Sequence, residues 1–332
     1  MPGPNRPSGE TLPRGFDTFE SAMLDCAMNK PLHLARPTAP DRGFRLPMRR
    51  RGLKFYLDRL VATYDHRFLS TDPLAFVHRY PDPEDQEIAG MVSSALAYGN
   101  VPAIRRSVDD ALSRLGPRPS RTLDACSEED LQARCRRFRH RFTTARDLAA
   151  LLGILRGIRR SHGSVQGFFL EGYARSAPTL REALVSFVER ALRRDLKPFY
   201  GGTPPQREGV RFLLPSPRRG SGCKRLNLYL RWMVRRADGV DLGLWREVEP
   251  RQLLMPVDTH VARIASYIGL TRRKSPGWAM TEEITAALRA MDPVDPVRYD
   301  FALCRLGILD ACPRHQDAIK CAACPLQPVC LL

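Results

Sequence analysis

The sequence predicts an all-α protein, and three observations point that way. Apolar residues recur at helical spacing in segment after segment between residues 53 and 309. Proline, glycine and early acidic residues separate these segments, as expected where helices begin and end. No segment alternates apolar and polar residues for long enough to predict a sheet. With 332 residues, of which 43% are hydrophobic, the chain is long enough for a sizeable helical core.

The predicted elements follow the chain in order. Residues 1–50 are rich in Pro, Arg and Gly, so we expect a flexible basic extension with one short helix around residues 16–28. A helix is expected from residue 53, with a break at Pro73. A buried helix should start at Pro83 and end before Gly99 and Asn100. Further helices are expected at 146–160, 180–195, 223–236, 258–269, 281–291 and 296–309, with a Pro/Gly/Arg-rich connection over 201–222.

Charge and targeting signals narrow the class of protein. The chain has 53 Lys and Arg against 36 Asp and Glu, and the net charge of +17 favours a polyanionic partner. A genome rich in Arg codons is the alternative explanation of this charge. No apolar run reaches the roughly 20 residues of a membrane span, and the N-terminal residues lack the apolar core of a signal peptide. We therefore expect a cytoplasmic monomer that binds nucleic acid and no membrane.

Four of the nine cysteines gather at the C-terminus. They form a Cys-x8-Cys-x2-Cys-x5-Cys pattern made of Cys312, Cys321, Cys324 and Cys330. Disulfides are rare in the cytosol, and four thiolates on one looping segment can surround a single metal centre. Both a [4Fe–4S] cluster and zinc accept four thiolates. Zinc sites usually have two separated Cys-x2-Cys pairs, so the single pair favours iron–sulfur. The other five cysteines are scattered and are expected to be small buried residues.

A Gly-Ser-Gly turn precedes the helix expected at 223–236. Its two glycines allow positive φ and a close approach to a phosphate, and the N–H groups at a helix N-terminus attract an anion. The candidate contacts to a DNA backbone are therefore Gly220, Ser221, Gly222, Cys223 and Arg225. Lys224, in the same turn, is either a further phosphate contact or a nucleophile activated by burial and by neighbouring arginines.

Asp258 follows an apolar run and precedes a predicted helix. Its expected place is the N-cap, where backbone N–H groups hold the carboxylate in position and keep it ionised. A fixed anion of this kind can stabilise an oxocarbenium-like sugar and help to deprotonate an attacking lysine. The sequence thus supplies an amine and a carboxylate that could act together.

These motifs occur in the order found in the helix–hairpin–helix DNA glycosylases. Residues 220–224, Gly-Ser-Gly-Cys-Lys, resemble the Gly-Val-Gly-Arg-Lys hairpin of endonuclease III, and residues 257–260 resemble its Val-Asp-Thr-His motif. Residues 299–330 resemble the C-terminus of endonuclease III and of the adenine glycosylases, where a Cys-x6-Cys-x2-Cys-x5-Cys loop holds [4Fe–4S]. The first gap here has eight residues instead of six. The resemblance covers residues 70–105 and 210–332.

The resemblance implies a two-lobed glycosylase fold over residues 51–311, with a hairpin at 215–236, an insertion at 237–255 and a cluster loop at 312–332. It implies that Lys224 attacks a sugar C1′ and that Asp258 is the essential carboxylate. The separation of 34 residues between them exceeds that of endonuclease III and is similar to that of the archaeal 8-oxoguanine glycosylases. The implied function is base-excision repair of double-stranded DNA in the bacterial nucleoid, by a DNA glycosylase with AP lyase activity. Oxidised guanine comes first among its substrates.

Under the same resemblance, four further residues are candidates for contact with the bases of DNA. Tyr98 and Asn100 are candidates to fill the gap left by a flipped base, and Tyr98 is equally a half-buried core aromatic. Trp245, in the insertion, is a candidate for stacking on a base. Asp300 either contacts a flipped base or caps its helix, whereas Trp232 is assigned to the core.

Other functions stay open. A non-catalytic protein that binds a DNA structure could use the same fold and basic surface, and a zinc loop could serve an RNA-binding protein. Over residues 50–310 the chain resembles still more closely a widespread bacterial family with no assigned function, through the strings KRLNLYLRWMVR, VDLGLW, DTH and YDFAL. That resemblance supports the fold more than the activity.

Overall fold

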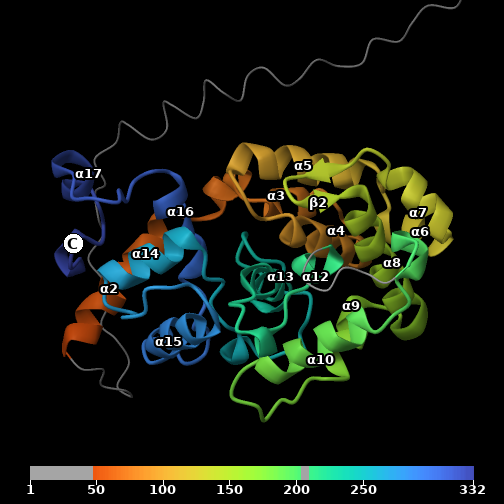
Figure 1. Cartoon of the computed structure of the whole chain (residues 1–332). Helices are drawn as coiled ribbons and strands as arrows, with labels where there is room; N and C mark the ends of the chain where they lie inside the picture. Colours follow the sequence, from red (N-terminus) through yellow and green to blue (C-terminus); the bar gives the residue numbers. More distant parts are fainter. Residues whose placement is uncertain (1–47, 203–208) are drawn as a thin grey trace, which may run out of the picture. The chain divides into compact units, whose positions relative to one another are not determined.

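The computed structural model describes residues 48–202 and 209–332 as a mostly helical unit (Figure 1). The short helix expected at 16–28 and the extension up to residue 47 lie outside the described residues. The first described helix begins at Met48, so it includes the last residues that the sequence analysis assigned to the extension. None of the described helices has the length and apolar character that a membrane crossing requires.

The longer helices carry most of the described chain. They are α2 (Met48–Thr63), α4 (Pro83–Ala95), α5 (Val101–Ser113), α7 (Glu128–Cys135), α8 (Ala145–His162), α10 (Arg181–Leu192), α13 (Lys224–Val234), α14 (Thr259–Tyr267), α15 (Trp278–Arg289) and α16 (Asp300–Ile308). The shorter ones are α3 (Leu74–Val77), α6 (Pro119–Ala125), α9 (Val165–Leu170), α11 (Lys197–Tyr200), α12 (Val210–Leu213) and α17 (Ala318–Ala322). Single 3-10 turns occur at η1 (His66–Thr71), η2 (Pro217–Arg219), η3 (Pro250–Gln252) and η4 (Gln327–Val329).

The prediction of an all-α chain is confirmed for the described residues, with one small exception. Strands β1 (Arg139–His140) and β2 (Thr143–Thr144) pair antiparallel in a hairpin. Each strand has only two residues, so no alternating pattern could predict it. The buried helix expected to start at Pro83 is confirmed as α4, whose N-cap is Asp82 and whose first turn carries acidic residues.

Helix α13 is buried along its whole length after its first residue. All its residues from Arg225 to Val234 are buried, and Trp232 lies in the core as predicted. Helix α4 packs directly against α13. Gly90 permits this approach, because a Cβ there would come within 2.8 Å of the Met233 Cε. The two helices therefore form one rigid support.

Helices far apart in the sequence meet beside this support. Figure 1 shows α2, from the start of the described chain, next to α14 and α16 from its end. Direct contacts join α16 to both α2 and α14. The hydroxyl of Tyr299 donates to Asp58 Oδ1 of α2 at 3.2 Å.

The insertion expected at 237–255 is tied into the core. Its backbone donates from Leu242 N to Trp232 O at 2.9 Å and from Trp245 N to Met233 O at 2.8 Å. The acceptors are carbonyl groups of the last turn of α13. The insertion therefore packs on the end of α13 as part of the fold. Its lack of helical periodicity is typical of exposed loops, but its backbone is held by α13.

Trp245 is consequently a core residue, and the prediction that it stacks on a base is wrong. Its side chain is 0% exposed. The indole Nε1 donates to Glu87 Oε1 at 2.6 Å, and the rings of Phe169 and Tyr229 lie 5.3 and 5.4 Å from its own. A buried indole whose N–H has a carboxylate partner is a structural anchor.

A buried network of charges fixes the end of α13. Arg231 is 1% exposed, donates to Asp241 Oδ1 at 3.1 Å and also pairs with Asp300. Arg235 donates to Asp241 Oδ2 at 2.5 Å. Burial raises the pKa of the Asp241 carboxyl, and the two guanidinium groups oppose that effect. Each charge in this network needs its partners, because an uncompensated buried charge is strongly destabilising.

We expect Asp241→Asn to lower the free energy of unfolding by about 3–5 kcal/mol, because it leaves two buried guanidinium groups short of a counter-charge. Urea denaturation followed by circular dichroism measures this change. Asp109→Asn is the matched control, since Asp109 pairs with Arg79 at a position where both side chains are more than half exposed; it should cost less than about 1 kcal/mol. Equal losses in the two variants would contradict the structural role of the network.

Candidate functional site

The start of α13 lies against the end of α4. Lys224 Nζ donates to Ala97 O at 3.0 Å, and Arg225 Nη1 donates to Ala95 O at 3.0 Å. Carbonyl groups at the C-terminal end of a helix carry partial negative charge, so cations there are stabilised. The two hydrogen bonds fix where the Lys224 amine lies.

The predicted turn before α13 is present, and its backbone is unusual. Gly220 has φ +74° and Cys223 has φ +46°. A left-handed conformation is uncommon for a residue other than glycine. A Cβ at Gly222 would lie 3.1 Å from Thr281 Oγ1, which is a tight contact. The Ser221 hydroxyl accepts from Cys223 N at 3.2 Å, so it braces the turn.

Two of the predicted DNA contacts are buried. Arg225 is 8% exposed and Cys223 is 1% exposed. Arg225 also donates to Phe212 O, and its guanidinium lies 4.2 Å from the Phe212 ring centroid. Burial lowers the pKa of Arg225 to about 10, because it makes the charged form less stable. This environment favours a role for Arg225 in holding the turn.

Asp258 is the N-cap of α14, as predicted. Its Oδ1 accepts from His260 N at 2.9 Å and from Val261 N at 2.8 Å. Its other oxygen, Oδ2, lies 3.6 Å from the Cys304 Sγ of α16. Burial, and to a smaller extent the nearby Asp258 carboxylate, raises the pKa of the Cys304 thiol to about 12. The thiol therefore stays protonated and can donate to Asp258.

Lys224 and Asp258 line one cavity of about 50 Å³. The cavity is also lined by Asp300 and Cys304 from α16 and by residues of α5, so α5, α13, α16 and the N-cap of α14 all contribute to it. Asp300 is paired with Arg231, yet burial and the nearby Asp258 carboxylate raise its pKa to about 6. Asp300 is the first residue of α16 rather than its cap. The structure thus brings together three of the predicted site residues.

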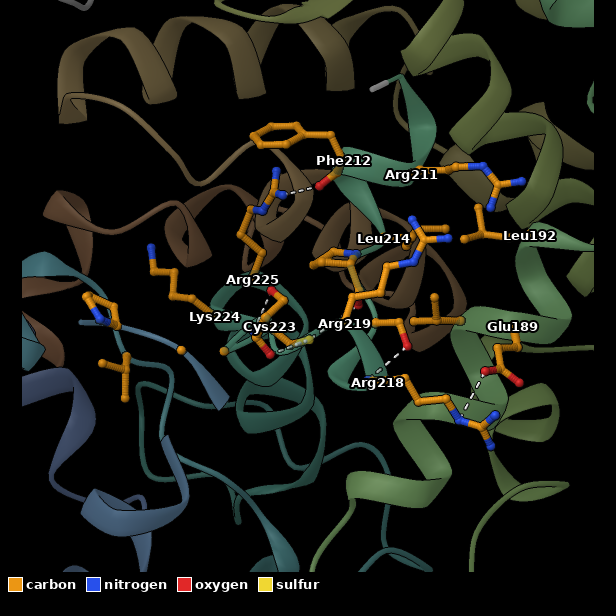
Figure 2. Close-up of a pocket in the computed structure, with 18 of the residues that line it drawn as sticks. Glu189, Leu192, Arg211, Phe212, Leu214, Arg218, Arg219, Cys223, Lys224 and Arg225 are labelled. Carbon is orange, nitrogen blue, oxygen red and sulfur yellow. Dashed lines mark hydrogen bonds and ion pairs between the residues drawn. The ribbon is translucent and has the colours of Figure 1, made fainter. Parts of the chain in front are cut away.

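A second hollow adjoins the same lysine. It is an open depression of about 800 Å³, and Lys224 lines both hollows. The cationic residues around the depression are Arg193, Arg211, Arg218, Arg219, Lys224 and Arg225. Figure 2 shows Lys224 extending away from Arg211, Arg218 and Arg219, on the opposite side of the turn. Glu189 is the acidic residue of the described lining, and it pairs with Arg218 at 3.3 Å.

Tyr98 and Asn100 lie in the short connection between α4 and α5 but have different surroundings. Tyr98 is half-buried, and its hydroxyl donates to His140 O and lies 2.7 Å from Thr143 Oγ1. This position agrees with the second of the two predictions for Tyr98, a half-buried core aromatic. Asn100 is exposed and caps α5, accepting from Ala103 N at 2.9 Å. Neither side chain lines the cavity at Lys224.

Three residues at or beside the site could not be recognised from the sequence. Cys304 was counted among the scattered cysteines, although it contacts Asp258. Arg305 and Asp72 form a buried ion pair of 3.1 Å in the cavity wall. Arg305 lies among apolar residues in the segment 300–309, so nothing nearby in the sequence marks it as a site residue. Asp72 lies more than 200 residues away, so no local pattern predicts that the two residues pair.

The four C-terminal cysteines lie near one another without forming a compact ligand set. Among the described residues, no three His, Cys, Asp or Glu side chains gather closely enough to hold a metal ion. Burial, the nearby Cys324 and the nearby Cys330 raise the pKa of the Cys312 thiol. The Cys321 sulfur accepts from Asp317 N at 3.4 Å. Four half-buried thiols in one segment provide suitable donors for zinc or iron–sulfur.

Comparisons with known proteins place the chain in a family. No curated protein and no solved structure matches it. Residues 72–309 match the family described as "Protein of unknown function (DUF2400)". The matched span includes Lys224, Asp258, Asp300 and Cys304 and ends before Cys312. Since the match covers more than half of the sequence, the chain belongs to the DUF2400 family.

Proposed function

We propose that this protein is a base-excision DNA glycosylase with AP lyase activity. The observation that carries the proposal is that Lys224 and Asp258, 34 residues apart in the sequence, line the same cavity. An amine beside a fixed carboxylate is the arrangement that covalent attack on a sugar carbon requires. The resemblance to archaeal 8-oxoguanine glycosylases puts oxidised guanine first among the substrates.

In the proposed reaction, deprotonated Lys224 Nζ attacks C1′ of the flipped nucleotide, and the bond from C1′ to the base breaks. The base takes up a proton as it leaves. The C1′–O4′ bond then breaks, O4′ takes up a proton, and the lysine forms a protonated Schiff base with the opened sugar. That cationic adduct acidifies C2′, and loss of a C2′ proton to water with cleavage of the C3′–O bond releases the 3′ phosphate by β-elimination. Asp258 stabilises the positive charge on the sugar. Asp300, with a pKa of about 6, is the proposed acceptor of the lysine proton at neutral pH.

The open depression is the proposed surface for the DNA backbone. Arg193 and Arg211 line it and form no ion pair with any described residue. Phosphates attract such side chains without regard to sequence. Since Lys224 lines both hollows, a strand in the depression would bring one of its nucleotides next to the lysine. This partner would place the protein in the bacterial nucleoid.

The size of the cavity favours one alternative. A volume of about 50 Å³ holds only a few water molecules, so a base could enter only if the lining of the cavity moved outward. A protein that binds a DNA structure without chemistry needs no such movement. The non-catalytic DNA-binding protein is therefore the second candidate function.

We also propose that Cys312, Cys321, Cys324 and Cys330 hold a [4Fe–4S] cluster, with zinc as the alternative. The support is the mutual effect of the thiols on their pKa values and the amide donated to Cys321. Such a cluster would brace the C-terminal segment. Its four ligands lie outside the lining of the cavity, so the cluster would contribute no atom to the proposed reaction.

Lys224→Ala is expected to abolish borohydride trapping on damaged duplex DNA, because only the Schiff base is reduced to a stable covalent adduct. A denaturing gel measures the adduct. Lys274→Ala removes an exposed lysine that does not line the cavity, and it should trap as wild type does. Trapping or strand cleavage that survives in Lys224→Ala would refute the nucleophile. A wild type that binds oxidised, deaminated and abasic duplexes but never traps would support the binding protein.

The single-turnover rate of base release should fall as the pH is lowered through about 6. The raised pKa keeps Asp300 protonated below that pH, and a protonated carboxyl cannot accept the lysine proton. Asp300→Asn should abolish this fall in rate below about pH 6 and lower the rate at neutral pH by about 10²–10⁴-fold. Asp109→Asn changes an exposed carboxylate on α5, and its rate should fall at low pH as that of the wild type does. An unchanged profile in Asp300→Asn would assign the proton transfer to another group.

Purified protein should be brown and contain iron and acid-labile sulfide. Cys324→Ser should lose most of both, because a cluster of this type needs all four thiolates. Cys126→Ser, which changes a buried cysteine outside the C-terminal segment, should keep them. Colourless protein with bound zinc would establish the alternative metal, and protein without either metal would remove the proposed centre.

A further inference from the structure

An aromatic side chain projects from the tip of the β-hairpin. Phe142 is 72% exposed, more than any other aromatic residue of the described chain. The register pairs His140 with Thr143, so Arg141 and Phe142 form a two-residue turn between the strands. A single exposed apolar residue is common on protein surfaces. Phe142 differs from such residues in two ways: its hairpin is held by hydrogen bonds, and it lies beside the basic depression.

The hairpin is fixed from beneath. Tyr98 donates to His140 O at 2.7 Å, and the His140 ring bonds to Tyr98 O at 3.0 Å and to Ser107 Oγ at 2.8 Å. Thr144 begins a capping box with Asp147 that starts α8. These contacts tie the hairpin to α5, to α8 and to the segment between α4 and α5. Phe142 is therefore presented on a rigid base, which lowers the entropy lost when it binds a partner.

The tip lies at the edge of the basic depression. The Phe142 ring lies 6.3 Å from the Phe212 ring at an interplanar angle of 83°. Phe212 lines the depression, and Figure 2 shows it above Arg225. The Arg141 guanidinium lies 5.5 Å from the Phe142 ring centroid. An exposed aromatic ring and a cation thus stand together beside a hollow lined with further arginines.

We propose that Phe142 is a stacking platform for a nucleobase of the DNA strand that lies in the depression. This inference rests on the proposed DNA partner and is independent of any chemistry at Lys224. A nucleobase offers a flat face that covers the exposed ring, and its phosphates meet the arginines of the depression. Stacking is tolerant of sequence, so the platform selects unstacked bases rather than a particular base. The preferred ligand is DNA with a locally unpaired strand.

Tryptophan fluorescence gives a direct test. The three native tryptophans, Trp232, Trp245 and Trp278, are buried, so wild-type emission should change little when DNA is added. In Phe142→Trp, emission should fall as a duplex with a short unpaired segment is titrated, because stacking on a base quenches the indole. Val294→Trp is the matched control, since Val294 is 67% exposed and does not line the depression; its emission should stay constant.

Affinity gives the second measurement. Phe142→Ala should bind the same DNA about 5- to 100-fold more weakly, while Val294→Ala should bind as wild type does. Both variants change an exposed side chain and should unfold at the same temperature as wild type. Unquenched Phe142→Trp together with unchanged affinity of Phe142→Ala would overturn the inference and leave the proposed function standing. A wild type that binds no DNA would overturn both.

Discussion

The contact between the start of α13 and the end of α4 is the constraint on which the candidate site depends. Lys224 and Arg225 are adjacent in the sequence, and each donates to a backbone carbonyl of the segment that ends α4. Arg225 is buried and forms no ion pair with a described carboxylate, so carbonyl dipoles and the Phe212 ring stabilise its charge. Its hydrogen bonds set the position of the turn, and the turn sets the position of Lys224 at the junction of the cavity and the depression.

Charge balance within the cavity wall determines what the carboxylates can do. Asp258 receives two backbone N–H groups, which hold its carboxylate in a fixed position. Asp300 forms an ion pair with Arg231, and the same guanidinium also pairs with Asp241. That shared partner does not fully offset the burial of Asp300, whose pKa is therefore raised. Two carboxylates in one cavity with different environments are suited to different roles, one as a fixed charge and one as a proton acceptor.

Local signals allowed the sequence to predict some of this site, and long-range packing explains the rest. The N-cap at Asp258 and the glycine turn before α13 depend on neighbouring residues, so both could be predicted. The burial of Trp245 depends on Glu87, more than 150 residues away. The hairpin that presents Phe142 has strands of two residues, which is too short for any periodicity. The volume of the cavity follows from four helices together and has no sequence signature.

The C-terminal segment is connected to the site through the helices that it contacts. Cys312 N donates to Leu306 O of α16 at 3.1 Å, and Arg263 of α14 donates to Cys312 O at 2.7 Å. Leu331 N donates to Tyr267 O at the end of α14. Asp258 caps the start of α14 and Cys304 belongs to α16, so the segment contacts both helices whose side chains meet, with 3.6 Å between Asp258 Oδ2 and Cys304 Sγ. A metal centre there would therefore act on the proposed chemistry by fixing the Asp258 carboxylate, without any contact with the reacting atoms.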